Sequence, residues 1–124
     1  MKKPTTAELE ILQVLWDRGP SSVRDVHNTL SKGRDVYYTT TLKTMQVMVS
    51  KELLVRDTTE RAHIYSAGIK QKDVEHNMID GLVDGVFRGS TTRLVVSAIG
   101  RSRPSADELA KIRAILDQLE KGEA

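Results

Sequence analysis

Residues 38–56 read YTTTLKTMQVMVSKELLVR, and this stretch decides the fold. Its first thirteen residues contain no glycine or proline, and Thr41, Met45 and Met48 recur at helical spacing. The pattern predicts a helix over Tyr38–Ser50 with one buried face. Because threonine and valine are only moderate helix formers, this helix must be stabilised by tertiary packing. The four residues that end the stretch form a short β-prone run.

A second β-prone run, Ala62-His63-Ile64-Tyr65, follows shortly downstream. The polar residues 57–61 between the two runs predict the loop of a β-hairpin. No Asn-Gly or Asp-Gly pair is present there to specify the type of turn. The helix of residues 38–50 is therefore expected to lead into a hairpin.

Two further helices are expected before residue 38. Thr5 and Glu8 have the spacing of a capping box, and Gly19-Pro20 ends the first helix. Ser22 and Asp25 repeat the capping pattern for a second, shorter helix. The order helix, helix, helix, hairpin is that of a winged helix-turn-helix. The apolar stripe of the first helix consists of Leu9, Leu12, Leu15 and Trp16.

Helical periodicity restarts after Gly68, which divides the chain into a winged-helix domain of residues 1–69 and a helical region of residues 70–124. The fold class expected is mainly α with a small β-hairpin. Three short C-terminal helices cannot bury much surface by themselves. Packing them against a second copy of the chain would form a twofold homodimer. The residues expected at that dimer interface are Leu82, Val86, Leu94, Val95, Ile112, Leu116 and Leu119.

Gly81, Gly85 and Gly89 are four residues apart. On one helix they would lie on one side and allow another backbone to approach closely. The alternative is that the helix is loose or has ended by this point. The first interpretation would add these glycines to the dimer packing.

The composition is that of a folded protein, with 124 residues, 39% hydrophobic and 29% charged. The formal net charge is +2, and the basic excess lies within residues 1–69. There is no cysteine for disulfides or thiolate metal sites. The N-terminus lacks the apolar core of a secretory signal, and no run approaches the ~20 apolar residues of a membrane span. A cytoplasmic location is therefore expected.

The sequence contains no nucleophile elbow, glycine-rich phosphate loop or paired-carboxylate signature. His27, His63 and His76 do not have the spacing of metal ligands. We therefore expect no catalytic residues, no metal and no cofactor.

Four residues of the third helix, Thr39, Thr40, Lys43 and Val47, are expected to share a face that is small, polar and free of acidic groups. Threonine can contact phosphates or base edges, threonine and valine can contact thymine methyl groups, and lysine can reach guanine or phosphate. This face is suited to the major groove of DNA. In the alternative interpretation Thr39 only caps the helix, the rest is solvated surface, and the winged helix binds another protein.

Arg56, Arg61 and His63 lie on or beside the predicted hairpin, where positive groups would contact a phosphate backbone. Such contacts supply affinity and no choice of sequence. The alternative is that they are ordinary exposed charges. Tyr37 and Tyr38 could donate hydrogen bonds to phosphates, although one of them is expected to pack against the first helix.

Short runs along nearly the whole chain follow a specific order and spacing. They are Glu8-Leu9-Glu10-Ile11-Leu12, Leu15-Trp16, Tyr38-Thr39-Thr40-Thr41-Leu42, Lys51-Glu52-Leu53-Leu54-Val55-Arg56, Arg61-Ala62-His63-Ile64-Tyr65, Phe87-Arg88-Gly89 and Leu94-Val95. In these runs the chain resembles the penicillinase repressor family (BlaI/MecI/CopY). The resemblance implies a homodimer in which each winged helix reads half of a double-stranded operator palindrome and the C-terminal helices hold the pair together.

The resemblance also implies repression of genes for β-lactamases, altered penicillin-binding proteins or copper export. Thr39, Thr40, Lys43 and Val47 match the positions at which the family's recognition helix contacts DNA. Some members carry arginine at the positions of Leu42, Gln46 and Val47, so the operator sequence cannot be transferred from them.

In β-lactam-responsive members a membrane sensor-protease triggers cleavage of the repressor, commonly at an Asn-Phe bond. The matching pair here is Ser97-Ala98, which differs from that specificity. The copper-responsive branch senses metal through C-terminal cysteines, which this sequence lacks. The expected function is non-enzymatic repression that ends when the dimer is lost, with proteolysis between Gly89 and Arg103 as one route. The alternative is a protein-binding winged helix without specific DNA binding.

Overall fold

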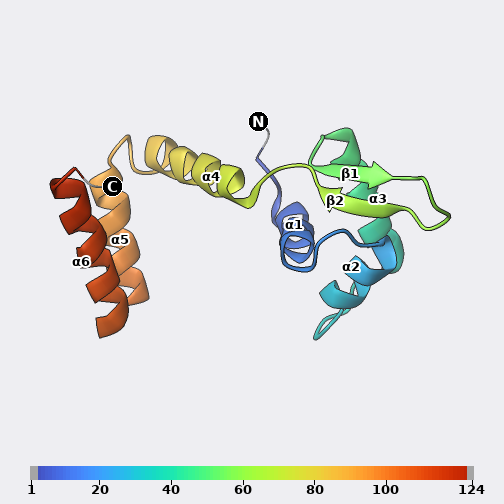
Figure 1. The fold of residues 1–124 in the computed structure, drawn as a ribbon, viewed down its shortest axis with the longest axis horizontal. Helices are drawn as coiled ribbons and strands as arrows, with labels where there is room; N and C mark the ends of the chain where they lie inside the picture. The colour runs from blue at the N-terminus through green and yellow to red at the C-terminus, as the bar shows by residue number, and fades with distance from the viewer. Residues whose placement is uncertain (1–2, 123–124) are drawn as a thin grey trace. The chain divides into compact units, whose positions relative to one another are not determined.

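The computed structural model describes residues 3–122, and the chain divides into two compact units, one through Ile79 and one from Asp80 onward. Within residues 3–122 the mainly helical fold with one two-stranded hairpin confirms the expected fold class. The elements, in chain order, are α1 (Thr6–Arg18), α2 (Val23–Leu30), α3 (Tyr38–Ser50), β1 (Leu54–Asp57), β2 (Ile64–Ala67), α4 (Gln71–Gly85), α5 (Thr91–Ser102) and α6 (Ala106–Glu120) (Figure 1).

Helix α1 begins with the capping box that its sequence predicts. The hydroxyl of Thr5 accepts a hydrogen bond from the Glu8 N–H at 3.1 Å, and the Glu8 carboxylate accepts one from the Thr5 N–H at 2.9 Å. The helix ends at Gly19, whose φ of 87° is one that glycine adopts without steric penalty. Trp16 is half-buried, and its indole N–H donates to the carbonyl of Ile69 at 3.0 Å. Trp16 is thus a packing residue that ties the end of the winged helix to α1.

Helix α3 has the bounds that its periodicity predicts, and Thr41, Met45 and Met48 are its buried residues. Met45 and Met48 pack with α1 and α2 in one apolar core, as expected for a helix of modest intrinsic propensity. The core consists of Ile11, Leu12, Val14, Leu15, Val23, Val26, Met45, Met48, Leu53, Leu54 and Tyr65.

Strands β1 and β2 pair antiparallel, with Leu54 opposite Ala67 and Asp57 opposite Ile64. Their loop projects away from the helices (Figure 1). The strands begin one and two residues later than the β-prone runs. Ser21 adds a bridge to the middle of β2, since its N–H and carbonyl both bond to the backbone of Tyr65, at 2.9 and 2.8 Å. This attachment of the wing to the turn before α2 was not predicted.

The side chain of Asp57 orders the hairpin loop. Its carboxylate accepts hydrogen bonds from the N–H and the hydroxyl of Thr59, at 2.9 and 2.7 Å. These bonds to the charged form hold the pKa of Asp57 below its ordinary value. An aspartate turn therefore shapes a loop that lacks an Asn-Gly or Asp-Gly pair.

Gly68 lies where the hairpin meets the end of α3. Its N–H donates to the Leu53 carbonyl at 2.8 Å, and a Cβ at this position would lie 2.9 Å from the Glu52 carbonyl oxygen. The chain therefore needs a residue without a side chain here.

Helix α4 crosses the boundary between the two compact units. Val74, in its first turns, is buried, whereas no residue of α5 or α6 is buried anywhere along these two fully described helices. The boundary between the two compact units therefore lies inside α4. The division into a DNA-binding domain of residues 1–69 and a dimerisation region of residues 70–124 stays a prediction. No helix within residues 3–122 has the length and apolar character to cross a membrane.

The proposed row of three glycines on one helix is wrong. Helix α4 ends at Gly85, and Gly89 lies beyond it with a φ of 83°. Gly89 follows Arg88, whose φ is also positive, so the pair forms a turn between α4 and α5. The structure supports the alternative, in which the helix has ended before Gly89.

Candidate nucleic-acid interface

The four predicted residues of α3 lie together on its solvent side. Thr39, Thr40 and Lys43 are exposed, and Val47 is 42% exposed. With Thr44 they form one wall of a groove of about 450 Å³, whose other wall is the start of α1, at Thr5, Ala7 and Glu8. The helix face predicted from the sequence therefore forms one wall of a groove, and the tertiary fold supplies the other wall.

Thr39 does not cap α3. The N-cap residue is Tyr37, which makes no side-chain capping bond, and Thr39 lies in the first turn of the helix. The interpretation in which Thr39 serves only as a cap is therefore wrong. The hydroxyl of Thr44 donates to the Thr40 carbonyl at 2.8 Å, so it is already bound within the helix.

Glu8 is the only acidic residue among those that line this groove, and its charge is neutralised there. The residue is 3% exposed, and its carboxylate is 2.8 Å from the Lys51 ammonium, just after the last turn of α3. Burial raises the pKa of Glu8, but hydrogen bonds from Lys51 and Thr5 outweigh it and lower the pKa below its ordinary value. The pair removes a charge that would repel a polyanion and joins the start of α1 to the end of α3.

We expect Glu8→Gln to lower the free energy of unfolding by about 1 to 2 kcal/mol at pH 7, because Lys51 loses its charged partner. The pKa of Glu8 is lowered in the folded state. The contribution of its charge to stability is therefore complete above a pH of about 4.5 and is lost as the pH falls through the lowered pKa. Urea unfolding of the wild type and the variant at pH 7 and pH 3 measures both effects.

The matched control is Glu10→Gln on the same helix. Glu10 pairs with Arg34 at 2.7 Å, but both side chains are well exposed, and such pairs contribute little. A change below about 0.5 kcal/mol is expected there. Equal losses in the two variants would contradict a special role for Glu8.

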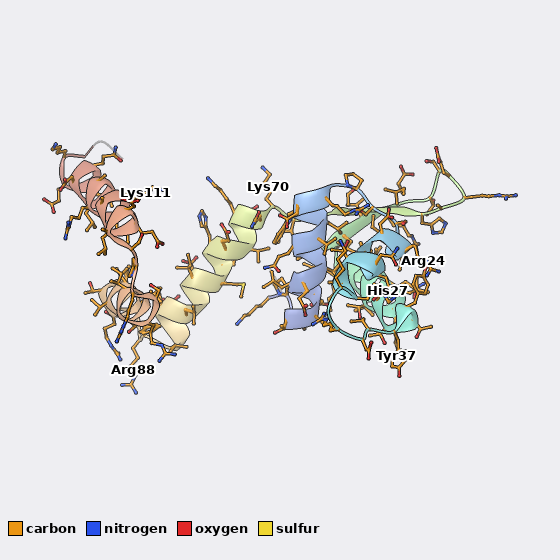
Figure 2. All side chains as sticks on the ribbon, turned by 90° about the horizontal axis from the view of Figure 1, so that it is seen from below. Arg24, His27, Tyr37, Lys70, Arg88 and Lys111 are labelled. Atoms are coloured by element: carbon orange, nitrogen blue, oxygen red, sulfur yellow. The ribbon has the colours of Figure 1, made fainter. Side chains whose placement is uncertain are left out.

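Tyr38 belongs to the contact between α2 and α3. Its ring meets the His27 ring edge-on, with centroids 5.4 Å apart, and the Arg24 guanidinium lies 4.3 Å from its centroid. His27 also hydrogen-bonds the buried Thr41 hydroxyl, at 3.2 Å. One tyrosine was expected to pack against the first helix, but the ring contacts of Tyr38 are with α2. Tyr37 is 82% exposed. Figure 2 shows Arg24, His27 and Tyr37 on the α2–α3 side of the winged helix.

Arg56, Arg61 and His63 are exposed on the wing, as expected. Arg61 and His63 line a recess of about 330 Å³ with Arg24 and Tyr38, while Arg56 lies on β1 and is not part of the lining. The structure thus brings three basic side chains from α2 and the wing to one recess. Sequence reasoning missed Arg24. The first turn of a helix favours anions, so an arginine at this position of α2 was an available signal of a role other than helix stability.

Two further residues of α3, Gln46 and Ser50, are also exposed. With Thr39 and Lys43 they follow the spacing of one helix face, at intervals of four, three and four residues. The predicted residues include Thr39 and Lys43 of this face but not Gln46 or Ser50. The exposed surface of α3 therefore holds more residues than the four predicted from the sequence.

The second compact unit exposes many large apolar side chains. Among the residues expected at a dimer interface, Leu94 and Ile112 are half-buried, and five are exposed. Exposed apolar surface of this extent is typical of a contact surface. The exposed five are Leu82, Val86, Val95, Leu116 and Leu119.

A family model described as "Penicillinase repressor" matches residues 4–118, which include the winged helix and nearly all of the C-terminal helices. The chain belongs to the penicillinase repressor family. This penicillinase repressor family member is therefore a transcriptional repressor and not an enzyme. Within residues 3–122 no group of three or more His, Cys, Asp or Glu side chains could hold a metal ion.

Individual relatives of this penicillinase repressor family member match over most of their length. It is 35% identical over 118 residues to the transcriptional regulator BlaI of Mycobacterium tuberculosis, covering 93% of this chain and 83% of that protein. It is 22% identical over 113 residues to the penicillinase repressor of Bacillus licheniformis, covering 90% and 88%. It is 18% identical over 114 residues to the methicillin resistance regulatory protein MecI of Staphylococcus aureus, covering 92% and 93%.

Proposed function

We propose that this repressor is a homodimer that binds a double-stranded operator palindrome through α3 and the wing. The observation that carries the proposal is the exposed, acid-free face of α3, at Thr39, Thr40, Lys43 and Val47, directly opposite the buried side of the helix. A helix held in this way can enter the major groove, because its core side is fully used by packing and its other side is free.

The recess beside the wing gives three of the remaining basic groups their roles. Arg61 and His63 on the wing and Arg24 on α2 contact the phosphate backbone next to the groove that α3 occupies. Arg56, which is exposed on β1, is the further basic group of the wing that reaches the backbone. Tyr38 acts through the packing of α2 on α3, and Tyr37 is the tyrosine that is free to donate to a phosphate. These contacts set the orientation of the protein on DNA, while α3 selects the sequence.

Dimerisation supplies the affinity that one winged helix lacks. The exposed face of α3 carries a single lysine, and the formal net charge of the chain is only +2. Two copies joined through α4, α5 and α6 would place one α3 in each half of a palindrome about one helical turn, or a multiple, apart. Joining the two binding events raises the overall affinity without any new contact to DNA.

Repression ends, in this proposal, when the dimer is lost. Ser97 and Ala98 are exposed in the middle of α5, so cleavage between them would divide the C-terminal region. The bond lies within a helix, and the Ala98 carbonyl also accepts a hydrogen bond from the Ser102 hydroxyl at 2.8 Å. A protease therefore needs local unwinding of α5. A membrane sensor-protease, or a protease acting downstream of one, is the partner proposed for this step.

A salt-titrated mobility shift on the promoter of the protein's own operon tests operator binding. Thr40→Ala and Lys43→Ala are expected to weaken specific binding. If Lys43 contacts a phosphate, its loss should reduce the salt slope by about one unit; if it reads a base, preference at that position should relax by about 1 to 3 kcal/mol.

Lys32→Ala is the matched control for Lys43→Ala. Lys32 is exposed, but it lines a different recess, between α1 and the end of α2. Its removal should leave the sequence preference unchanged. Equal binding of the wild type to scrambled DNA would contradict operator recognition and would favour a winged helix that binds another protein.

A further inference from the structure

Gln46 lies on the solvent side of α3 and is exposed. At about 100° per residue, Lys43 points directly away from the buried Thr41, Met45 and Met48. Gln46 is turned about 60° from Lys43 on one side, and Thr40 is turned by about the same angle on the other. Gln46 therefore belongs to this surface as fully as Thr40 does.

The amide of Gln46 is free, while neighbouring hydroxyl groups are not. Ser50 donates to the Gln46 carbonyl at 3.3 Å, and Thr44 donates to the Thr40 carbonyl at 2.8 Å. The side-chain amide of Gln46 forms no hydrogen bond with any residue between 3 and 122. Gln46 is thus the one side chain on the exposed side of α3 that can donate and accept through a planar amide.

We propose that Gln46 reads an adenine in each operator half-site, by a bidentate contact to the N6 amino group and N7 in the major groove. Glutamine and asparagine match this donor and acceptor pair, which no other base edge presents in the same order. The inference rests on the proposed function, because it requires α3 to lie in the major groove. It adds a residue that determines sequence specificity to the four chosen from the sequence.

The recess beside the wing shows on which side the adenine lies. Leu42 lines that recess with Arg61 and His63, and Gln46 follows Leu42 by one helical turn on the same side of α3. Lys43 and Val47 instead line the groove next to α1. The adenine is therefore on the wing side of the base or phosphate that Lys43 contacts, and Val47 is placed to contact a thymine methyl group on the other side.

Selection from a randomised double-stranded DNA library, followed by competition binding, tests the proposal with the full-length protein. The wild type should select a palindrome with one strongly preferred A·T pair in each half. Gln46→Ala should lose about tenfold to hundredfold of the discrimination at that pair and keep the other preferences. Gln46→Arg should prefer G·C at the same position, because arginine is bidentate to guanine O6 and N7.

Gln13→Ala is the matched control, since Gln13 is an exposed glutamine that lines the recess on the other side of α1. It should select the wild-type sequence. A palindrome selected with equal base preferences by the wild type and both Gln46 variants would overturn the role of Gln46 and leave operator binding intact. A wild-type protein that selects no sequence would instead overturn the proposed function itself. Unchanged thermal unfolding of the variants excludes misfolding as the cause of a loss.

Discussion

Leu116→Glu is expected to convert the dimer into a monomer and to weaken binding to the full operator by about a hundredfold or more. Leu116 is 51% exposed in α6, a helix that buries no residue within its own chain. A glutamate there would bury an unpaired charge in the proposed interface, and burial of an unpaired charge is strongly unfavourable. Sedimentation equilibrium reports the oligomeric state, and a mobility shift on the full operator reports the affinity.

DNA with a single half-site separates this effect from damage to the reading surface. Leu116 and α3 belong to different compact units, so half-site binding should be unchanged. Gln118→Glu is the matched control, because it adds the same charge to an exposed polar position of the same helix. A dimeric Leu116→Glu protein with wild-type operator affinity would show that α6 does not form the interface.

Leu12→Ala is expected to lower the free energy of unfolding of the winged-helix unit by about 2 to 5 kcal/mol. Leu12 is completely buried, in the core that also holds Met45 and Met48 of α3. The substitution removes apolar contacts and leaves a cavity that the surrounding helices can only partly fill. Since α3 is held in place by this core, operator binding should be lost at a lower temperature than in the wild type.

Urea unfolding followed by the fluorescence of Trp16 measures this change, because Trp16 packs against the same core. Gln13→Ala, at the next position of α1, is exposed and should change the free energy of unfolding by less than about 0.5 kcal/mol. If both variants unfolded at the wild-type midpoint, the packing of α1 on α3 would not be what stabilises this unit.

The helices and their starts were predictable because the interactions that define them are local. The capping box at Thr5 and the cap at Ser22 each join residues three positions apart. The buried residues of α3 follow one period of the helix, so both its bounds and its core side could be read from spacing. Residues that point away from this buried side face solvent, and the predicted Thr39, Thr40, Lys43 and Val47 are accordingly all exposed.

Several features of the candidate interface depend on residues that are far apart in the chain. Lys51 meets Glu8 across 43 positions, and Ser21 bridges to Tyr65 in the wing. Arg24 becomes part of the surface only because α2 packs against Tyr38 and the wing folds back beside it. The proposed glycine row failed for a local reason, since the turn at Arg88 and Gly89 ends the helical geometry that the row required.

The sequence by itself determined the order of helices and hairpin, the caps and the side of α3 that is exposed, because helical period and capping act over three or four residues. Only the tertiary structure decided which groups lie next to the exposed side of α3. They are the start of α1 with the neutralised Glu8, and the recess lined by Arg24, Arg61 and His63. Such neighbours are set by the packing of side chains in the core. Packing brings together residues that are far apart in the chain and have no regular spacing in the sequence, so a periodic pattern cannot predict them.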